Sequence, residues 1–324
     1  MTRLRRLPAL ALMTAAGTTA CGGRLDAGYD LPHGALPVDE RSATIVLNEG
    51  ARDNWQGEYA ALFAATGQLR VVGLIVNASS AYPSLEANVG GFRQMLAAAR
   101  DSGMKHLPEV TGSIAPALTP PQDEVIEETV PNRSEGARLI LQAAAEHATP
   151  THPLAIATGG ALTDVADAYL LDPSLAERAV VVASLGRIAG AEVYTDNPNG
   201  NLDAWATFIV ASRMHYVQVN GFYDQLQDVP DDQVADLPQN PFGQWIADKR
   251  ATILHLQSAC DQVSVLSVAL PYFALDVTHM RVSEADHGKL TPDANGPIWH
   301  VGGADSDRMR AEIWAKLNDP RTFR

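Results

Sequence analysis

The chain has 324 residues, of which 46% are hydrophobic and 19% are charged, and its formal net charge is −14. These values are ordinary for a soluble globular protein, and the length allows one large α/β domain or two modest ones with a sizeable core. The negative charge argues against nucleic-acid binding through phosphate contacts and fits a protein that acts on a small molecule.

The first 21 residues have the pattern of an export signal. A basic stretch, MTRLRR, precedes a short apolar run, LPALALMTAAG, and the small residues TTA lead to Cys21. Small residues before a single cysteine resemble a bacterial lipobox. We therefore expect Cys21 to be lipidated and the protein to be exported and anchored to a membrane of the bacterial cell envelope. Thr18 departs from the leucine that this pattern prefers, so soluble export after cleavage near Ala20 and an uncleaved arm stay open.

The rest of the chain is predicted to form one domain. Residues 22–40 are rich in glycine and proline and lack periodicity, which predicts a linker between the anchor and a domain over residues 41–324. The only other cysteine is Cys260, so no disulfide is expected within the chain.

Apolar strands alternate with helical segments along this domain, which predicts an α/β fold with a mostly parallel central sheet flanked by helices. Strands are predicted in segments 43–48, 71–79, 153–158, 178–186 and 215–221. Helices are predicted in segments 55–66, 84–103, 135–148, 161–171 and 203–212. Two segments rich in proline and acidic residues, 116–134 and 224–245, are predicted to be loops or lids over the open edge of the sheet.

Ligands of open α/β sheets bind beyond the carboxyl ends of the strands, so the strand-to-helix junctions are candidate sites. Four such junctions carry polar residues, and in a fifth place Asp261 interrupts an apolar run: 48–55, 77–83, 157–164, 196–206 and 255–270. Their polar atoms are mainly oxygens of Asp, Asn, Thr and the backbone, which are the ligands that Ca²⁺ or Mg²⁺ prefers.

Purely structural roles are also open at these junctions. Asp53 and Asn54 suit the cap of the next helix, and Asp203 suits the first turn of a helix. The glycines of ATGGALTD suit a tight turn between strand and helix. Asp261 is harder to explain in this way, because a carboxylate within an apolar run needs a partner or a metal.

The order of these segments resembles the nucleoside hydrolases, the inosine–uridine-preferring N-ribohydrolases, over most of residues 43–318. LNEGARDNW stands where that family has D-x-D-P-G-x-D-D, and LAIATGGALTD resembles a stretch containing P-T-G-x-L-T-N. NPNGNLDAWATFIV resembles E-F-N-x-x-x-D-P-x-A-A, and SACDQVSVLSVALP stands where the family has H-D-P-x-A-V-A.

This resemblance implies a parallel-sheet α/β sandwich in one domain that holds Ca²⁺ and hydrolyses the N-glycosidic bond of a ribonucleoside or similar compound. In the family the ion binds the ribose diol and activates the attacking water. The residues that match metal ligands are Asp53, Thr158 through its backbone carbonyl, and Asp261. Asp53 is implied in catalysis, and we expect the neighbouring Glu49 to be recruited to act with it. Those implied in substrate binding are Asn54, Asn197, Asn199 and Asp203.

The sequence departs from the family in its acidic cluster. Asn48 and Asn54 are neutral where carboxylates are usual, and each lost charge weakens the attraction for a divalent cation. Cys260 also replaces a histidine near the leaving base. A hydrolase and a non-catalytic nucleoside- or sugar-binding protein therefore both stay open, and so does a scaffold whose site is filled by Trp55 or Tyr82. The oligomeric state is open as well, a homo-oligomer included.

Overall fold

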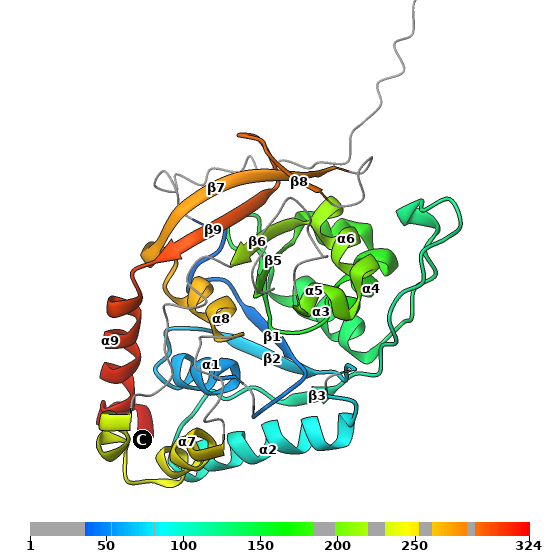
Figure 1. Ribbon diagram of the computed structural model, residues 1–324. Helices are drawn as coiled ribbons and strands as arrows, with labels where there is room; N and C mark the ends of the chain where they lie inside the picture. Colours follow the sequence, from blue (N-terminus) through cyan, green and yellow to red (C-terminus); the bar gives the residue numbers. More distant parts are fainter. Residues whose placement is uncertain are drawn as a thin grey trace, which may run out of the picture.

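The computed structural model describes residues 36–52, 54–80, 82–184, 198–219, 231–252, 261–283 and 289–324. Within these ranges the chain forms one α/β domain in which a mostly parallel sheet lies between two layers of helices (Figure 1). The predicted fold class is confirmed.

The described part of the sheet has nine strands in the order β3-β2-β1-β4-β5-β6-β9-β7-β8. Strands β1 to β6 run parallel to one another, and β9 runs parallel to β6. At one edge β7 pairs antiparallel with both β9 and β8. The strands are β1 (Thr44–Asn48), β2 (Val71–Val76), β3 (Val110–Gly112), β4 (Leu154–Thr158), β5 (Ala179–Ser184), β6 (His215–Val219), β7 (Ala274–Ser283), β8 (Lys289–Pro292) and β9 (Ile298–Ala304).

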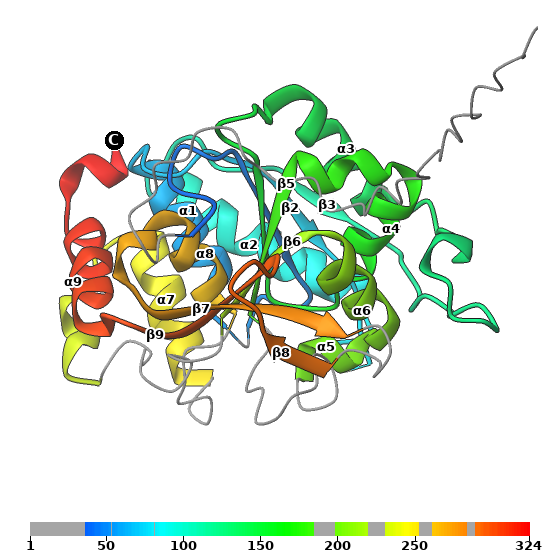
Figure 2. The same cartoon turned by 90° about the horizontal axis from the view of Figure 1, so that it is seen from above.

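The helices that connect these strands cover both faces of the sheet. They are α1 (Gln56–Ala65), α2 (Leu85–Asp101), α3 (Glu135–His147), α4 (Thr163–Leu171), α5 (Pro198–Leu202), α6 (Ala204–Arg213), α7 (Pro241–Thr252), α8 (Gln262–Ala269) and α9 (Ser306–Leu317). Helices α1, α7, α8 and α9 lie on one side of the sheet and α3, α4 and α6 on the other (Figure 2). One core contains the buried residues of α1, α2, α7, α8 and α9, and a second contains those of α3, α4 and α6. The strands are apolar on both faces of the sheet, so each face packs against its own layer of helices and forms its own core.

Helix α2 shows how local sequence sets these elements. The Ser84 hydroxyl accepts a hydrogen bond from the Ala87 N–H at 3.2 Å and so caps the first turn. Phe92, Met95 and Ala99 follow at helical spacing and are buried against the sheet. The chain then turns at Gly103, whose φ of 91° is a conformation that favours glycine.

Register in the middle of the sheet brings three strand ends to one edge. Leu47 pairs with Thr158, and Thr158 pairs with Ala183, so β1, β4 and β5 end side by side. Asn48 and Ser184 are the last residues of β1 and β5, and Gly159 follows β4 directly. The loops after these strands therefore start from one place, as expected for an open α/β sheet.

Two parts of the sequence prediction need correction. Segment 224–245 was predicted as a loop, but α7 begins at Pro241, where proline suits the first helical position and the Asn240 side chain accepts the Gly243 N–H at 2.9 Å. Strands β7 and β9 were not predicted, whereas β8 lies within DHGKLTPD, residues 286–293, which resembles a late strand and turn of the family. Segment 116–134 is a loop as predicted, apart from a 3-10 turn at Ile126–Glu128.

Leu36 and Val38 are buried in the core, although they belong to the segment that the sequence suggests is a linker. In the part of the chain that the structure describes, no helix combines the length and the apolar character that a membrane span requires.

Candidate functional site

Asp261 is the centre of a polar cluster at the carboxyl edge of the sheet. It stands just before α8, and only 3% of its surface is exposed. Its Oδ2 accepts a hydrogen bond from Asn48 Nδ2 at 3.2 Å, and its Oδ1 accepts one from Asn199 Nδ2 at 3.0 Å. Three segments that are distant in sequence thus meet at one carboxylate, as the resemblance implied for Asn199 and Asp261.

The orientation of the Asn48 amide is fixed by the backbone. Its Oδ1 accepts the N–H groups of Glu49 at 2.7 Å and of Gly50 at 2.8 Å. A backbone N–H can only donate, so the contacted atom must be the oxygen of the amide. The NH₂ group of Asn48 therefore faces Asp261.

The Asn199 amide is fixed in the same way. Its Nδ2 donates to the Ser184 carbonyl at 2.6 Å as well as to Asp261. Because a carbonyl can only accept, the nitrogen must be on this side. Both amides that contact the Asp261 carboxylate thus present hydrogens to it.

Gln56 completes the cluster and was not among the residues singled out from the sequence. Its Oε1 accepts from Asn48 Nδ2 at 2.6 Å, and its Nε2 donates to the Ser264 hydroxyl at 2.8 Å and the Ala157 carbonyl at 3.3 Å. Asn54 Oδ1 accepts the Gln56 N–H at 3.0 Å. We call Asn48, Asn54, Gln56, Asn199 and Asp261 the amide–carboxylate cluster.

The glycine pair after β4 allows this cluster to form. A β-carbon added at Gly159 would lie 2.0 Å from the β-carbon of Asp261 and 2.7 Å from Asn48 Nδ2. At Gly160 the added carbon would lie 3.2 Å from Oε2 of Glu49, so the buried Glu49 side chain rests against this glycine. The Gly159–Gly160 pair thus forms a turn and also leaves room for the side chains of Asp261 and Glu49 to approach the backbone closely.

Thr158 lies directly beside the cluster, but its side chain points to the other face of the sheet, the face that Leu47 and Ala183 share. The Thr158 hydroxyl is buried and has no hydrogen-bond partner in the described structure. Across the described ranges, no group of three or more His, Cys, Asp or Glu residues is arranged to hold a metal ion.

Asp203 has the structural role that the sequence left open. It precedes α6, and its Oδ1 accepts the Ala206 N–H at 3.0 Å. Its Oδ2 accepts the Leu118 N–H and the Thr163 hydroxyl, both at 2.8 Å. Oδ1 therefore caps α6, while Oδ2 joins α6 to the loop at Leu118 and to α4. Burial raises the pKa of the Asp203 carboxyl above its ordinary value.

A second buried acid lies beyond the end of β2. Asp164, in the first turn of α4, accepts hydrogen bonds from the Ser113 hydroxyl at 2.6 Å and from Asn77 Nδ2 at 3.4 Å. Burial raises the pKa of the Asp164 carboxyl, although these hydrogen bonds act in the opposite direction.

This raised pKa has a measurable consequence. The native state holds the Asp164 proton to a higher pH than the unfolded state does. The free energy of unfolding should therefore fall as pH rises from about 4 through the raised pKa, and then level off. Asp164→Asn should remove this part of the pH dependence, and urea unfolding between about pH 4 and 7 measures it. Asp203 contributes equally to the pH dependence of the wild type and of Asp164→Asn, so its effect cancels in the comparison. Identical pH profiles of the two proteins would contradict a raised pKa for Asp164.

Beneath the cluster, a buried ion pair holds α7 against α1. Lys249 Nζ lies 2.7 Å from Oε1 of Glu58, and the two side chains are 1% and 3% exposed. The ammonium also donates to the Asn54 carbonyl and lies 4.6 Å from the centre of the Trp55 ring. Trp55 is thus a core residue whose face is covered by a cation, while Tyr82 is half-buried and hydrogen-bonds through its backbone to Ser79.

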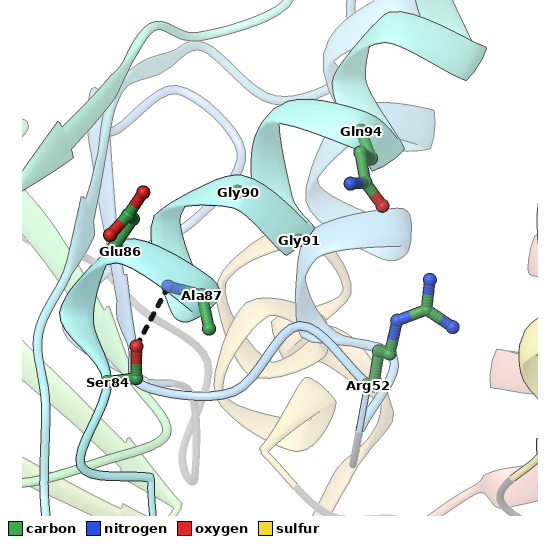
Figure 3. Close-up of a pocket in the computed structure, with 7 residues that line it drawn as sticks. All are labelled: Arg52, Ser84, Glu86, Ala87, Gly90, Gly91 and Gln94. Atoms are coloured by element: carbon green, nitrogen blue, oxygen red, sulfur yellow. Dashed lines mark hydrogen bonds between the residues drawn. The ribbon is translucent and has the colours of Figure 1, made fainter.

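A separate cavity of about 570 Å³ lies over the first turns of α2 (Figure 3). Arg52 and Gln94 lie toward one end of it and Glu86 toward the other. No residue of the amide–carboxylate cluster lines this cavity. Its lining residues are Arg52, Ser84, Glu86, Ala87, Gly90, Gly91 and Gln94.

Several residues named from the sequence lie outside the described ranges. These are Cys21, Asp53, Asn197 and Cys260. The structure thus places Asn48, Asn54, Asn199 and Asp261 together, with Glu49 and Thr158 beside them, and places Asp203 in a helix cap.

Comparison of the sequence with protein-family models and with curated protein sequences finds no match. Solved structures do match. The inosine–uridine preferring nucleoside hydrolase from Bacillus anthracis is 14% identical, with 85% of this chain and 99% of that chain covered and a TM-score of 0.58. The plant nucleoside hydrolase PpNRh1 is also 14% identical, with 86% and 99% covered and a TM-score of 0.61.

A third similar structure is the type III effector protein XopQ in complex with adenosine diphosphate ribose. It is 14% identical, with 89% of this chain and 95% of that chain covered and a TM-score of 0.58. At this level of identity the likeness concerns the fold, which is that of the nucleoside hydrolases. The chain thus has the fold of the nucleoside hydrolases, and the solved structures that share it include effectors as well as hydrolases.

Proposed function

We propose that this protein binds a nucleoside or a related ribosyl compound at the amide–carboxylate cluster and does not hydrolyse it. The observation that carries this proposal is the Asp261 carboxylate, which is buried and receives amide hydrogens from Asn48 and Asn199. The cluster is organised for hydrogen bonding, and most of its members are neutral.

The chemistry of the cluster suits sugar hydroxyls. A hydroxyl both donates and accepts, and a carboxylate has about four lone-pair sites, so a carboxylate such as Asp261 can accept several hydrogen bonds at once. Asn54 and Asn199 bring amide groups to the same edge. The XopQ complex with adenosine diphosphate ribose supports a ligand of this class, because that protein has the same fold.

Hydrolysis of an N-glycosidic bond is the second candidate function, and Glu49 is the observation that favours it. This buried acid lies against Gly160 at the same edge and could deprotonate a water molecule. In that reaction Asp53 would act with Glu49, and Asp53, Thr158 and Asp261 would hold the Ca²⁺ ion that the sequence resemblance implies. Asn197 would contact the ribose in either function.

The location of the protein is a further part of the proposal. The basic and apolar N-terminal stretch before Cys21 supports export and lipidation at this cysteine, with a membrane-anchored protein on the cell envelope. A nucleoside-type ligand would then be captured outside the cytoplasm.

The test measures binding and turnover in the same samples. Calorimetry with a panel of ribonucleosides and adenosine diphosphate ribose gives the affinity, and an assay for released ribose gives turnover. Asp261→Asn should weaken binding by about 10- to 100-fold, because it removes a charged acceptor worth about 1.5–3 kcal/mol. Glu86→Gln is the control, since it removes one exposed charge away from the cluster.

Saturable binding without ribose release, lost in Asp261→Asn and kept in Glu86→Gln, agrees with the proposal. Ribose release that disappears in Glu49→Gln would establish hydrolysis instead. The absence of binding to every member of the panel would contradict both functions.

A further inference from the structure

The cluster around Asp261 occupies the place where the sequence resemblance implies a calcium ion, and its donor set does not fit one. Ca²⁺ takes 6–8 oxygen ligands, in large part from carboxylates and carbonyls. Here Asn48 and Asn199 both turn an amide nitrogen toward the Asp261 carboxylate, at 3.2 Å and 3.0 Å. The positive ends of amide dipoles stand where a cation would stand.

The amide oxygens of the cluster are engaged elsewhere. Asn48 Oδ1 accepts two backbone N–H groups, those of Glu49 and Gly50. Asn54 Oδ1 accepts the Gln56 N–H at 3.0 Å, and Gln56 Oε1 accepts Asn48 Nδ2 at 2.6 Å. Turning any of these oxygens toward a metal would leave a buried N–H without its acceptor, which is costly.

A fixed positive charge lies next to the same loop. The buried Lys249 ammonium donates to the carbonyl of Asn54, and the side chain of Asn54 contacts Asn48 at 3.4 Å. The charge of Lys249 is paired with Glu58 and belongs to the packing of α7 on α1. The Lys249–Glu58 pair has no net charge, so it adds no attraction for a divalent cation to that of the cluster.

We propose that amide hydrogens stand in for the divalent cation in this protein, so that hydrogen bonds from Asn48 and Asn199 stabilise the Asp261 carboxylate and the cluster does not bind calcium or magnesium. This inference goes beyond the proposed function, because it concerns a metal ion. Its test contains no organic ligand, so the two can fail separately.

Calcium chloride and magnesium chloride, each added alone to the metal-free full-length protein, provide the test. Calorimetry and the thermal midpoint Tm are the readouts. The wild-type protein should show no metal binding that depends on Asp261, so any heat or shift in Tm should be the same in Asp261→Asn. Calcium binding that is present in the wild type and lost in Asp261→Asn would overturn the proposal.

The reverse experiment restores the carboxylate. Asn48→Asp puts a negatively charged carboxylate oxygen in the position of Asn48 Nδ2, which faces Asp261. The two carboxylates then repel each other unless a cation lies between them. This variant should have a lower Tm than the wild type without metal and a Tm that rises with calcium concentration. A folded Asn48→Asp protein whose Tm ignores calcium would contradict the role assigned to this amide.

Discussion

Replacing Lys249 with methionine is expected to lower the free energy of unfolding by about 3–5 kcal/mol, the usual cost of removing one partner from a buried ion pair. Lys249 and Glu58 are both almost fully buried, and their charged atoms lie 2.7 Å apart. Without the ammonium, Glu58 keeps only the Trp245 indole N–H at 2.7 Å among its described partners. The Asn54 carbonyl also loses the hydrogen bond from Lys249.

Urea unfolding of the wild type, Lys249→Met and the double variant Lys249→Met/Glu58→Leu measures this effect. The double variant removes both charges, so it should recover most of the stability that the single variant loses. A single variant within about 1 kcal/mol of the wild type would show that the pair is not buried in solution, since exposed pairs contribute about that much or less.

Gly159→Ala is expected to have the second large effect, because it disrupts both the fold and the amide–carboxylate cluster. The new methyl group would lie 2.0 Å from the Asp261 β-carbon, and both Asp261 and Asn48 would have to move. Overpacking of this kind costs on the order of 1–3 kcal/mol. Ligand binding at the cluster should be lost as well, because its central carboxylate is displaced.

Gly90→Ala is the matched control, since it makes the same change in the middle of α2. A β-carbon there meets no atom within 4 Å. Alanine in place of a helical glycine should raise the free energy of unfolding by about 0.5–1 kcal/mol. Urea unfolding and calorimetry of both variants give the comparison, and a Gly159→Ala protein with wild-type stability and binding would contradict the packing around Asp261.

Much of the fold could be predicted from the sequence because its elements carry strong local signals. Helix α2 begins at a serine cap and ends near a glycine, and its apolar residues recur at helical spacing. The apolar strands between such helices indicate a parallel sheet. Strands β7 and β9 were missed because both mix exposed and buried residues without clear alternation.

The meeting of Asn199 and Asp261 could also be predicted, because parallel strands end at the same edge and the resemblance named both residues. The role of Gln56 could not be predicted, since a glutamine in the first turn of a helix is usually exposed. The Lys249–Glu58 pair joins residues 191 positions apart, and nothing in either local sequence indicates it. The direction of the Asn199 amide depends on the Ser184 carbonyl, which only the folded chain brings beside it, whereas that of Asn48 is set by the N–H groups of Glu49 and Gly50.

A crystal structure of the protein grown with a bound ribonucleoside and with calcium in excess is the most direct test of the account. We expect the ribose hydroxyls within hydrogen-bond distance of Asp261, with Asn48 and Asn199 still donating to its carboxylate and an intact N-glycosidic bond. A calcium ion coordinated by Asp261 in place of the two amides, or a nucleoside bound away from Asp261, would contradict it.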